Sequence, residues 1–356
     1  MNIQDIDKNF QLDNSVRKDG MIQYTIPHKN FDLYGVYYNP EDNRFWRMDK
    51  AVTEQIHANV TMLAQHTAGG RLRFSTDSNK LDLAVEYETL WAVPHMTLTG
   101  SSGFMLLEEL EDGQTKLVQM FAPWPGQKDG YTLTATLNGG KMKNYILWFP
   151  LYNQVTKLVI GLEENATVAS GRKYRDIKPI LYYGSSITQG AAASRPDNCY
   201  QALISKWNNI DFINLGFSGH AKGEDEMVDY LTTFDCSLFV CDYDHNAPDA
   251  EHLKKTHYRL YERYRKVRPD TPILFLTSPS DRFEKEPERR KVIRQTYEKA
   301  KKLGDNDVYF IDGKNLFGKI DRVNCTVDGV HPTDLGFYRI AKKIYKKIME
   351  IDELFK

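Results

Sequence analysis

Long apolar segments are missing from this sequence of 356 residues. No segment approaches the roughly 18 consecutive apolar residues that a membrane-spanning helix requires. The polar start at residues 1–5 also lacks the basic and apolar regions of a signal peptide. We therefore expect a protein that does not associate with membranes and that resides in the cytoplasm.

A bias of charge is missing as well. The 47 basic and 48 acidic residues are interspersed and leave a formal net charge of −1, so no basic stripe indicates nucleic acid as a partner. Cysteines are few, and the four present lack the spacing of a disulfide framework or a zinc site. Cys236 and Cys241 flank an apolar run, and we expect both to be buried thiols.

The motifs of several common enzyme classes are absent. Residues 216–220 lack the closing glycine of a Gly-X-Ser-X-Gly elbow, which argues against the α/β-hydrolase fold. Neither a phosphate-binding loop nor a dinucleotide-binding glycine pattern occurs. We therefore expect no cofactor.

The composition and the length favour two globular domains. Hydrophobic residues make up 41% of the chain, which is enough for two cores at this length. Residues 1–172 contain many short alternating runs separated by turn residues, the pattern of a β-sandwich or jelly roll. The runs at 52–56 and 60–64 fit either strands or short helices. The clearest strands are expected at residues 71–74, 81–85, 132–136 and 157–160.

Residues 173–356 have a different rhythm, in which apolar runs alternate with helical patterns. This alternation predicts an α/β domain, a parallel sheet covered by helices on both faces. A ligand site in such a domain lies at the carboxyl ends of the strands. The strands are expected at 180–183, 212–214, 238–241, 273–277 and 308–311, and the helices near 198–208, 224–233, 249–268, 284–303 and 332–352.

A serine follows the first of these strands. Gly184 permits a sharp turn, and Ser186 would then lie at the start of a helix, where backbone N–H groups favour an oxyanion. Ser186 is thus a candidate nucleophile. The alternative is an ordinary loop in which Ser186 only caps the helix.

Two further strand ends offer hydrogen-bond donors. Gly219, in the segment 214–220, could present its backbone N–H to an oxyanion, although the segment also fits an ordinary turn. His220 would be a polar surface residue rather than a base. After the third strand, Asn246 could donate its side-chain amide. The acidic segment 242–245 could instead bind a metal, but no histidine pair at ligand spacing supports that alternative, so we expect no metal.

A carboxylate and an imidazole stand three residues apart before the last helix. At this spacing Asp328 can orient the ring of His331 and stabilise its protonated form. The alternative is a polar loop with a helix cap. Because all these segments follow strands of one sheet or precede its last helix, they are expected to meet, and together they supply the groups for serine-based acyl transfer.

The four segments, in this order, resemble the SGNH (GDSL-type) hydrolase superfamily. The family's Gly-Asp-Ser-Ile block reads Gly-Ser-Ser-Ile at 184–187, with Ser185 in the place of a structural aspartate. The resemblance implies Ser186 as nucleophile, His331 as base and Asp328 as its orienting carboxylate. It also implies an oxyanion hole formed by Ser186, Gly219 and Asn246, although the segment around Asn246 departs furthest from the family's Gly-X-Asn-Asp block.

Residues 67–78 and 95–104 resemble the β-sandwich domain that precedes certain SGNH esterases. The signature of that domain, Gly-X-Asp-Leu-Tyr, is degraded at 103–107. Trp91 and Trp124 could stack on a sugar, but a core or structural role is the favoured interpretation.

The resemblance implies a serine esterase that removes short acyl groups from sugars, with acetyl as the expected group and acetylated xylo-oligosaccharides as an example. The expected partner is thus an acylated carbohydrate. Two alternatives remain open: an acyltransferase that uses the same triad on a small alcohol, and a non-catalytic sugar-binding protein. The oligomeric state also remains open, a homo-oligomer included.

Overall fold

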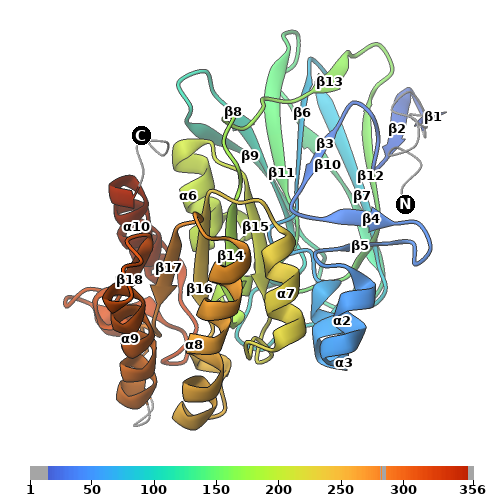
Figure 1. The fold of residues 1–356 in the computed structure, drawn as a ribbon. Helices are drawn as coiled ribbons and strands as arrows, with labels where there is room; N and C mark the ends of the chain where they lie inside the picture. The colour runs from blue at the N-terminus through green and yellow to red at the C-terminus, as the bar shows by residue number, and fades with distance from the viewer. Residues whose placement is uncertain (1–14, 281, 283–285, 352–356) are drawn as a thin grey trace.

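The computed structural model describes residues 15–280, 282 and 286–351. Two antiparallel sheets from the N-terminal half pack face to face, and a parallel sheet with helices on both faces lies beside them (Figure 1). The predicted fold class, an all-β sandwich followed by an SGNH-type α/β domain, is confirmed. No described helix combines the length and hydropathy that a membrane span needs.

The sandwich encloses its own hydrophobic core. Along β7 (Lys80–Tyr87) buried and more exposed residues alternate, because successive side chains of a strand point to opposite faces. Leu81, Leu83 and Val85 of β7 face Leu72 and Phe74 of β6 across this core. One sheet has the order β1-β2-β12-β7-β10 and the other β13-β6-β11-β8-β9, with β3 paired to β6. The remaining bounds are β1 (Ser15–Lys18), β2 (Met21–Thr25), β3 (Asp32–Tyr34), β6 (Arg71–Thr76), β8 (Phe104–Glu109), β9 (Thr115–Phe121), β10 (Gly130–Thr136), β11 (Lys143–Trp148), β12 (Val155–Glu163) and β13 (Val168–Ser170).

The runs at 52–56 and 60–64, for which the sequence left strand or short helix open, lie in a helical segment of the sandwich domain. After the hairpin β4 (Tyr37–Asn39) and β5 (Arg44–Trp46), the chain forms α2 (Lys50–Ile56) and α3 (Ala58–Ala64). Asp49 and His57 cap them, since their side chains accept hydrogen bonds from Ala51 N–H at 2.8 Å and Asn59 N–H at 3.0 Å. Both runs are therefore helices, and a further short helix, α4 (Leu98–Ser101), precedes β8.

The C-terminal half forms a five-stranded sheet of order β15-β14-β16-β17-β18, and every pair in it is parallel. All five strands lie where the alternation of apolar runs predicts them. They are β14 (Ile180–Gly184), β15 (Phe212–Gly216), β16 (Leu238–Asp242), β17 (Ile273–Leu276) and β18 (Val308–Ile311).

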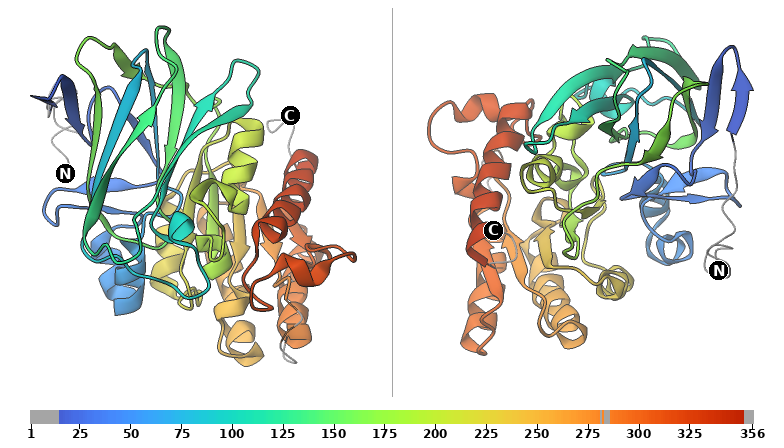
Figure 2. Two further views of the ribbon diagram at one scale, coloured as in Figure 1. Left: turned by 180° about the vertical axis from the view of Figure 1, so that it is seen from behind. Right: turned by 90° about the horizontal axis from the view of Figure 1, so that it is seen from above.

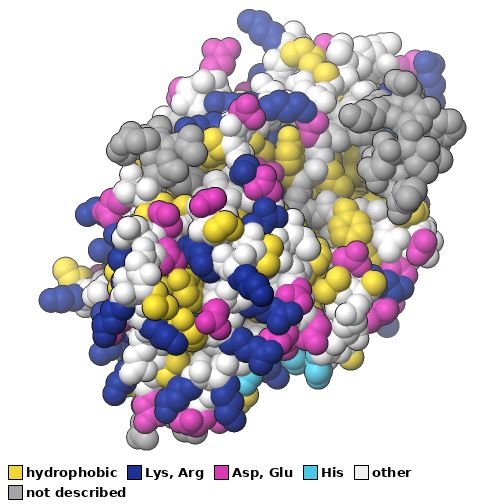
Figure 3. Space-filling model, in the orientation of Figure 1, with side chains coloured by type: hydrophobic (Ala, Val, Ile, Leu, Met, Phe, Trp, Pro, Cys, Tyr) yellow, Lys and Arg dark blue, Asp and Glu magenta, His cyan; other side chains and the backbone are white. Residues whose placement is uncertain are grey.

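Helices cover both faces of this sheet (Figure 2). On α10 (Asp334–Ile351), Ile340, Ile344 and Ile348 are buried while Lys342 and Lys343 are exposed, as the helical spacing of its apolar residues predicts. Basic and acidic side chains are mixed on the face in Figure 3. One face carries α6 (Tyr200–Asn208) and α10 (Asp334–Ile351), and the other carries α7 (Asp225–Thr233), α8 (Ala250–Val267) and α9 (Glu286–Lys302).

The sandwich is fixed against β15, the edge strand of the parallel sheet. Arg71 is fully buried, forms an ion pair with Asp211 and lies 4.1 Å from the ring centroid of Phe212. The ring of Trp148 stacks on the same phenylalanine, with centroids 6.2 Å apart. The strand that leads to Gly219 is therefore held at its amino end by the other domain.

All four cysteines are buried and free, which confirms the prediction for Cys236 and Cys241.

Candidate active site

Ser186 lies at the turn between β14 and the one-turn helix α5 (Ser186–Gln189). A Cβ atom at Gly184 would come within 2.2 Å of the Asp242 carbonyl oxygen, so the close approach of β14 and β16 requires glycine here. Ser185 is the N-cap, and its hydroxyl accepts a hydrogen bond from Ile187 N–H at 3.2 Å. The serine that replaces the family's aspartate can therefore still cap this helix, while Ser186 is left to face the site.

Ser186, His331 and Asp328 form a continuous chain of hydrogen bonds. Ser186 Oγ lies 3.0 Å from His331 Nε2, and His331 Nδ1 lies 2.7 Å from Asp328 Oδ2. Asp328 Oδ1 accepts hydrogen bonds from His331 N–H at 2.8 Å and Val330 N–H at 2.9 Å. The structure thus brings together the three residues that the sequence proposed for the triad. α10 begins only at Asp334, so Asp328 and His331 lie in the preceding loop.

The electrostatics of this loop favour an ionised Asp328. Burial by itself raises the pKa of Asp328, but the hydrogen bonds from the backbone of His331, from the His331 ring and from the backbone of Val330 outweigh it and lower the pKa to about 2. The carboxylate can therefore hold Nδ1 as an N–H donor, which leaves Nε2 to accept a proton from Ser186.

Gly219 and Asn246, the two hydrogen-bond donors expected to complete the oxyanion hole with Ser186, lie on loops that contact each other. Gly219 has φ +73°, and no heavy atom lies within 4 Å of the position that a Cβ would take. Asn246 ends the short helix η2 (Asp244–Asn246), and its Oδ1 accepts a hydrogen bond from Ala221 N–H at 3.2 Å. This bond ties the Asn246 amide to the Gly219 loop and directs its NH₂ group away from Ala221.

His220 is engaged elsewhere. Its Nε2 lies 2.7 Å from Asn59 Nδ2 and its Nδ1 lies 2.9 Å from the Ser218 carbonyl oxygen. Both ring nitrogens thus have partners outside the Ser186 chain. The sequence-based interpretation of His220 as a polar residue rather than a base agrees with this geometry.

Arg47 supports the site from the sandwich domain, and sequence reasoning missed it. Its guanidinium donates to the carbonyl oxygens of Asn214 and Gly216, both at 2.9 Å, and to those of His66 and Leu63. Burial lowers the pKa of Arg47 to about 9. Because backbone carbonyls are its partners, no residue pattern near Arg47 could have indicated this role.

His95 is the second residue that sequence reasoning passed over. It lies between β7 and α4 in the sandwich domain, and its ring stacks on His331, with centroids 4.6 Å apart and an interplanar angle of 19°. Burial and the neighbouring His331 lower the pKa of His95. Trp91 in the same connection and Trp124 are 51% and 75% exposed, so neither tryptophan lies in the core.

The carboxylates at the end of β16 and just after it, Asp242 and Asp244, are buried. Asp242 Oδ2 accepts a hydrogen bond from Thr188 Oγ1, and Asp244 Oδ2 accepts one from Ser278 N–H at 2.8 Å. Burial raises the pKa of both carboxyls and lowers that of His245 to about 3. Among the described residues, no group of three or more histidine, cysteine or carboxylate side chains is arranged to hold a metal ion.

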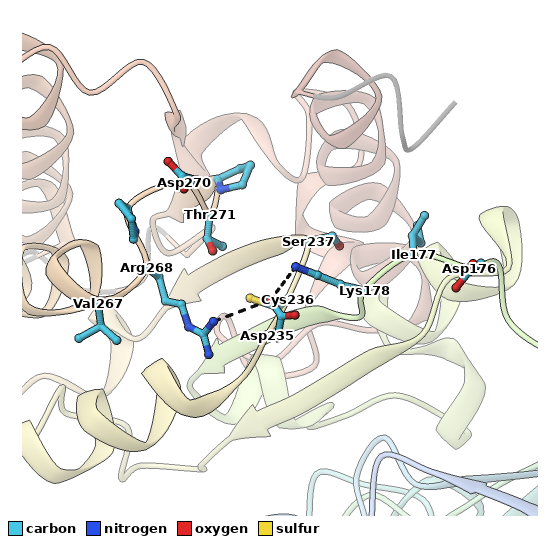
Figure 4. Close-up of a pocket in the computed structure, with 12 residues that line it drawn as sticks. Asp176, Ile177, Lys178, Asp235, Cys236, Ser237, Val267, Arg268, Asp270 and Thr271 are labelled. Carbon is cyan, nitrogen blue, oxygen red and sulfur yellow. Dashed lines mark ion pairs between the residues drawn. The ribbon is translucent and has the colours of Figure 1, made fainter.

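A shallow hollow of about 660 Å³ lies at the opposite end of the parallel sheet (Figure 4). Lys178 and Arg268 approach Asp235 there, at 2.8 and 3.8 Å. Its lining segments precede β14, β16 and β17, so it is at the amino ends of the strands and away from Ser186. The lining consists of residues 176–178, 235–237 and 267–272.

Two sequence families match the chain. The GDSL-like lipase/acylhydrolase family matches residues 177–350, and the family described as the N-terminus of SGNH-hydrolase-type esterases matches residues 22–168, despite the degraded signature at 103–107. A search of curated proteins found no match.

Solved structures with the same two-domain layout are similar over almost the whole chain. A candidate GDSL-like lipase from Bacteroides ovatus is 27% identical, with a TM-score of 0.84 over 93% of this chain and 98% of that one. The salicylyl-acyltransferase SsfX3 from a tetracycline biosynthetic pathway is 18% identical, with a TM-score of 0.78 over 95% and 99%. An acetyl xylan esterase (Est2A) from the rumen bacterium Butyrivibrio proteoclasticus is 13% identical, with a TM-score of 0.59 over 92% and 98%.

The matches divide the chain where its architecture changes, between the last strand of the sandwich and the first strand of the parallel sheet. The chain therefore belongs to the SGNH (GDSL-type) hydrolase superfamily, in the group whose members carry an N-terminal β-sandwich domain.

Proposed function

We propose that this protein is a serine esterase that removes short acyl groups, acetyl above all, from the hydroxyl groups of sugars. The observation that carries the proposal is the chain of hydrogen bonds from Ser186 through His331 to Asp328, at 3.0 and 2.7 Å. Serine, imidazole and carboxylate in this order are the groups that acyl transfer through a covalent intermediate needs.

The chemistry follows from the geometry of these groups. His331 Nε2 takes the proton of Ser186 as the hydroxyl attacks the ester carbonyl, and then gives it to the departing sugar alkoxide. Asp328 holds the ring and stabilises the imidazolium. Water, deprotonated by His331, then attacks the acyl-enzyme and releases the carboxylic acid and free Ser186.

The developing oxyanion would be bound by the backbone N–H groups of Ser186 and Gly219 and by the side-chain amide of Asn246. Ser186 begins α5, where the N–H groups at the helix start lack partners within the helix. The open side of Gly219 and the fixed amide of Asn246 support these roles. One such donor typically lowers the barrier by ~2.7–4 kcal/mol.

The carbohydrate substrate is supported by two features. The solved structure of Est2A, an acetyl xylan esterase by name, is similar over 92% of this chain. Trp91 and Trp124 also expose aromatic surface that could stack on a sugar. The test is the Ser186→Ala variant on acetylated xylo-oligosaccharides and 4-nitrophenyl acetate. Loss of turnover on both supports the proposal, and turnover near that of the wild type would exclude Ser186 as the nucleophile.

Acyl transfer to an alcohol is the second candidate function. It is favoured by the similarity to the salicylyl-acyltransferase, which extends over 95% of the chain. The triad would be unchanged, and an acceptor alcohol would replace water in the second step. Product analysis at low acceptor concentration separates the two, because transfer that outruns hydrolysis would identify an acyltransferase.

A further inference from the structure

The ring of His331 is covered by a side chain from the other domain. His95 lies nearly parallel to it, at 4.6 Å between ring centroids and an interplanar angle of 19°. This separation is at the short end of the range in which aromatic rings attract each other. In the plane of the ring, Asp328 Oδ2 holds the His331 edge that carries Nδ1, at 2.7 Å. The base is therefore constrained both in the plane of its ring and on one face.

The segment that carries His95 is anchored at both ends. On one side, Trp91 N–H donates to Asn153 Oδ1 at 2.8 Å, and the buried Asn153 donates in turn to the Ser101 carbonyl oxygen at 3.0 Å. On the other side, Thr97 Oγ1 donates to the carbonyl oxygen of Ser194, at 3.0 Å, in the catalytic domain. These bonds, with Val93 and Met96 packed against the core, fix the position of His95.

Stacking requires that the two rings never both carry a charge. During turnover His331 becomes an imidazolium each time it takes the proton of Ser186. The charged groups that act on His95 are His331 and Asp328, and burial together with His331 lowers the pKa of His95. A neutral His95 can lie against the imidazolium without repulsion, and it keeps water from that face of the ring.

We propose that His95 is a positioning residue for His331, which holds the imidazole in the plane that joins Ser186 to Asp328, so that the sandwich domain completes the catalytic centre. The inference rests on the proposed acyl-transfer function of the triad. His95 acts through His331 and is not itself required to exchange a proton. A planar ring that cannot titrate should therefore replace it.

The experiment compares His95→Ala, His95→Phe and a control, His57→Asn, in the full chain. His57 is also a histidine of the sandwich domain that contacts an imidazole, that of His220 at 5.3 Å between centroids, but this partner is not a residue of the triad. Asparagine at this position retains a side chain that can cap α3.

With 4-nitrophenyl acetate we expect His95→Ala to lower kcat about three- to tenfold, which corresponds to the loss of one aromatic pair, with KM nearly unchanged. His95→Phe should restore most of kcat, and His57→Asn should behave as the wild type. Wild-type kcat in His95→Ala, or a His95→Phe variant as impaired as the alanine variant, would overturn the inference.

A second measurement does not depend on activity. In the Ser186→Ala background, the ring-proton resonance of His331, assigned through its loss in His331→Gln, should move downfield when His95 becomes alanine, because the ring current of the stacked imidazole is lost. If the resonance does not move, the stack is absent and the inference fails. If the chain hydrolyses no acyl ester but the resonance moves, the proposed function fails while the stack stands.

Discussion

Replacement of Asn246 tests the part of the proposed site that departs furthest from the family pattern. If its amide donates to the oxyanion, Asn246→Ala should lower kcat by about 10²–10³, equivalent to ~2.7–4 kcal/mol. The same change removes the acceptor of Ala221 N–H, which Asn246 Oδ1 provides at 3.2 Å. An unpaired buried N–H costs roughly 1–3 kcal/mol of stability, so this variant should also unfold more easily.

Asn246→Asp separates these two effects. A carboxylate still accepts the hydrogen bond of Ala221 N–H, but it has no N–H to donate and places negative charge beside the developing oxyanion. We expect kcat to fall at least as far as in the alanine variant, with a smaller loss of stability. The assay is steady-state hydrolysis of 4-nitrophenyl acetate, paired with urea unfolding of both variants.

If Asn246→Asp retains kcat within about tenfold of the wild type, far less than the loss of one oxyanion donor causes, the side-chain amide does not bind the oxyanion. A fall in kcat that only parallels the fall in stability, in both variants, would assign Asn246 to the support of the Gly219 loop instead.

Three other changes test neighbouring parts of the account. Asp328→Asn should lower kcat by roughly 10⁴, since its amide N–H₂ would face Nδ1 and force the wrong tautomer of His331; an unchanged circular dichroism spectrum would show that the fold survives, and near-normal kcat would exclude the orienting role. Ser185→Ala should cost about 0.5–2 kcal/mol of stability, because α5 loses its cap, while kcat persists. A complete loss of kcat in this variant, with Ser186→Ala unaffected, would instead move the nucleophile to Ser185. Burial raises the pKa of Glu286 from 4.5 to about 7, so the folded state binds more protons than the unfolded state between these values and stability should fall as pH rises through this window. Glu286→Gln should flatten that decline in urea unfolding between about pH 5 and about pH 8, and an unchanged slope would contradict the raised pKa.

Much of the C-terminal domain could be predicted because its signals are local. Each strand is a short apolar run, and Gly184 marks the turn that presents Ser186. The expectation that Ser186, Gly219 and Asn246 lie close together followed from one rule, namely that the carboxyl ends of parallel strands share an edge of the sheet. The spacing of three positions from Asp328 to His331 then sufficed to place their hydrogen bond.

The contribution of the sandwich domain could not be predicted, because it depends on contacts between distant parts of the chain. Arg47 donates to Asn214, 167 residues away, through backbone carbonyls that carry no sequence signal. His95 acquires its place only when the loop after β7 docks on the catalytic domain. The helices α2 and α3 stayed ambiguous because each is only seven residues long, too short for a periodic pattern to separate helix from strand.

In the proposed reaction, Ser186 carries the acyl group during turnover. The most direct measurement is mass spectrometry of the protein after acid quench of the reaction with 4-nitrophenyl acetate, followed by peptide mapping. We expect an added acetyl group on the peptide that contains Ser186, and no such group in Ser186→Ala. An acetyl group that appears on another residue at the same rate, or an adduct that persists in Ser186→Ala, would contradict this role of Ser186.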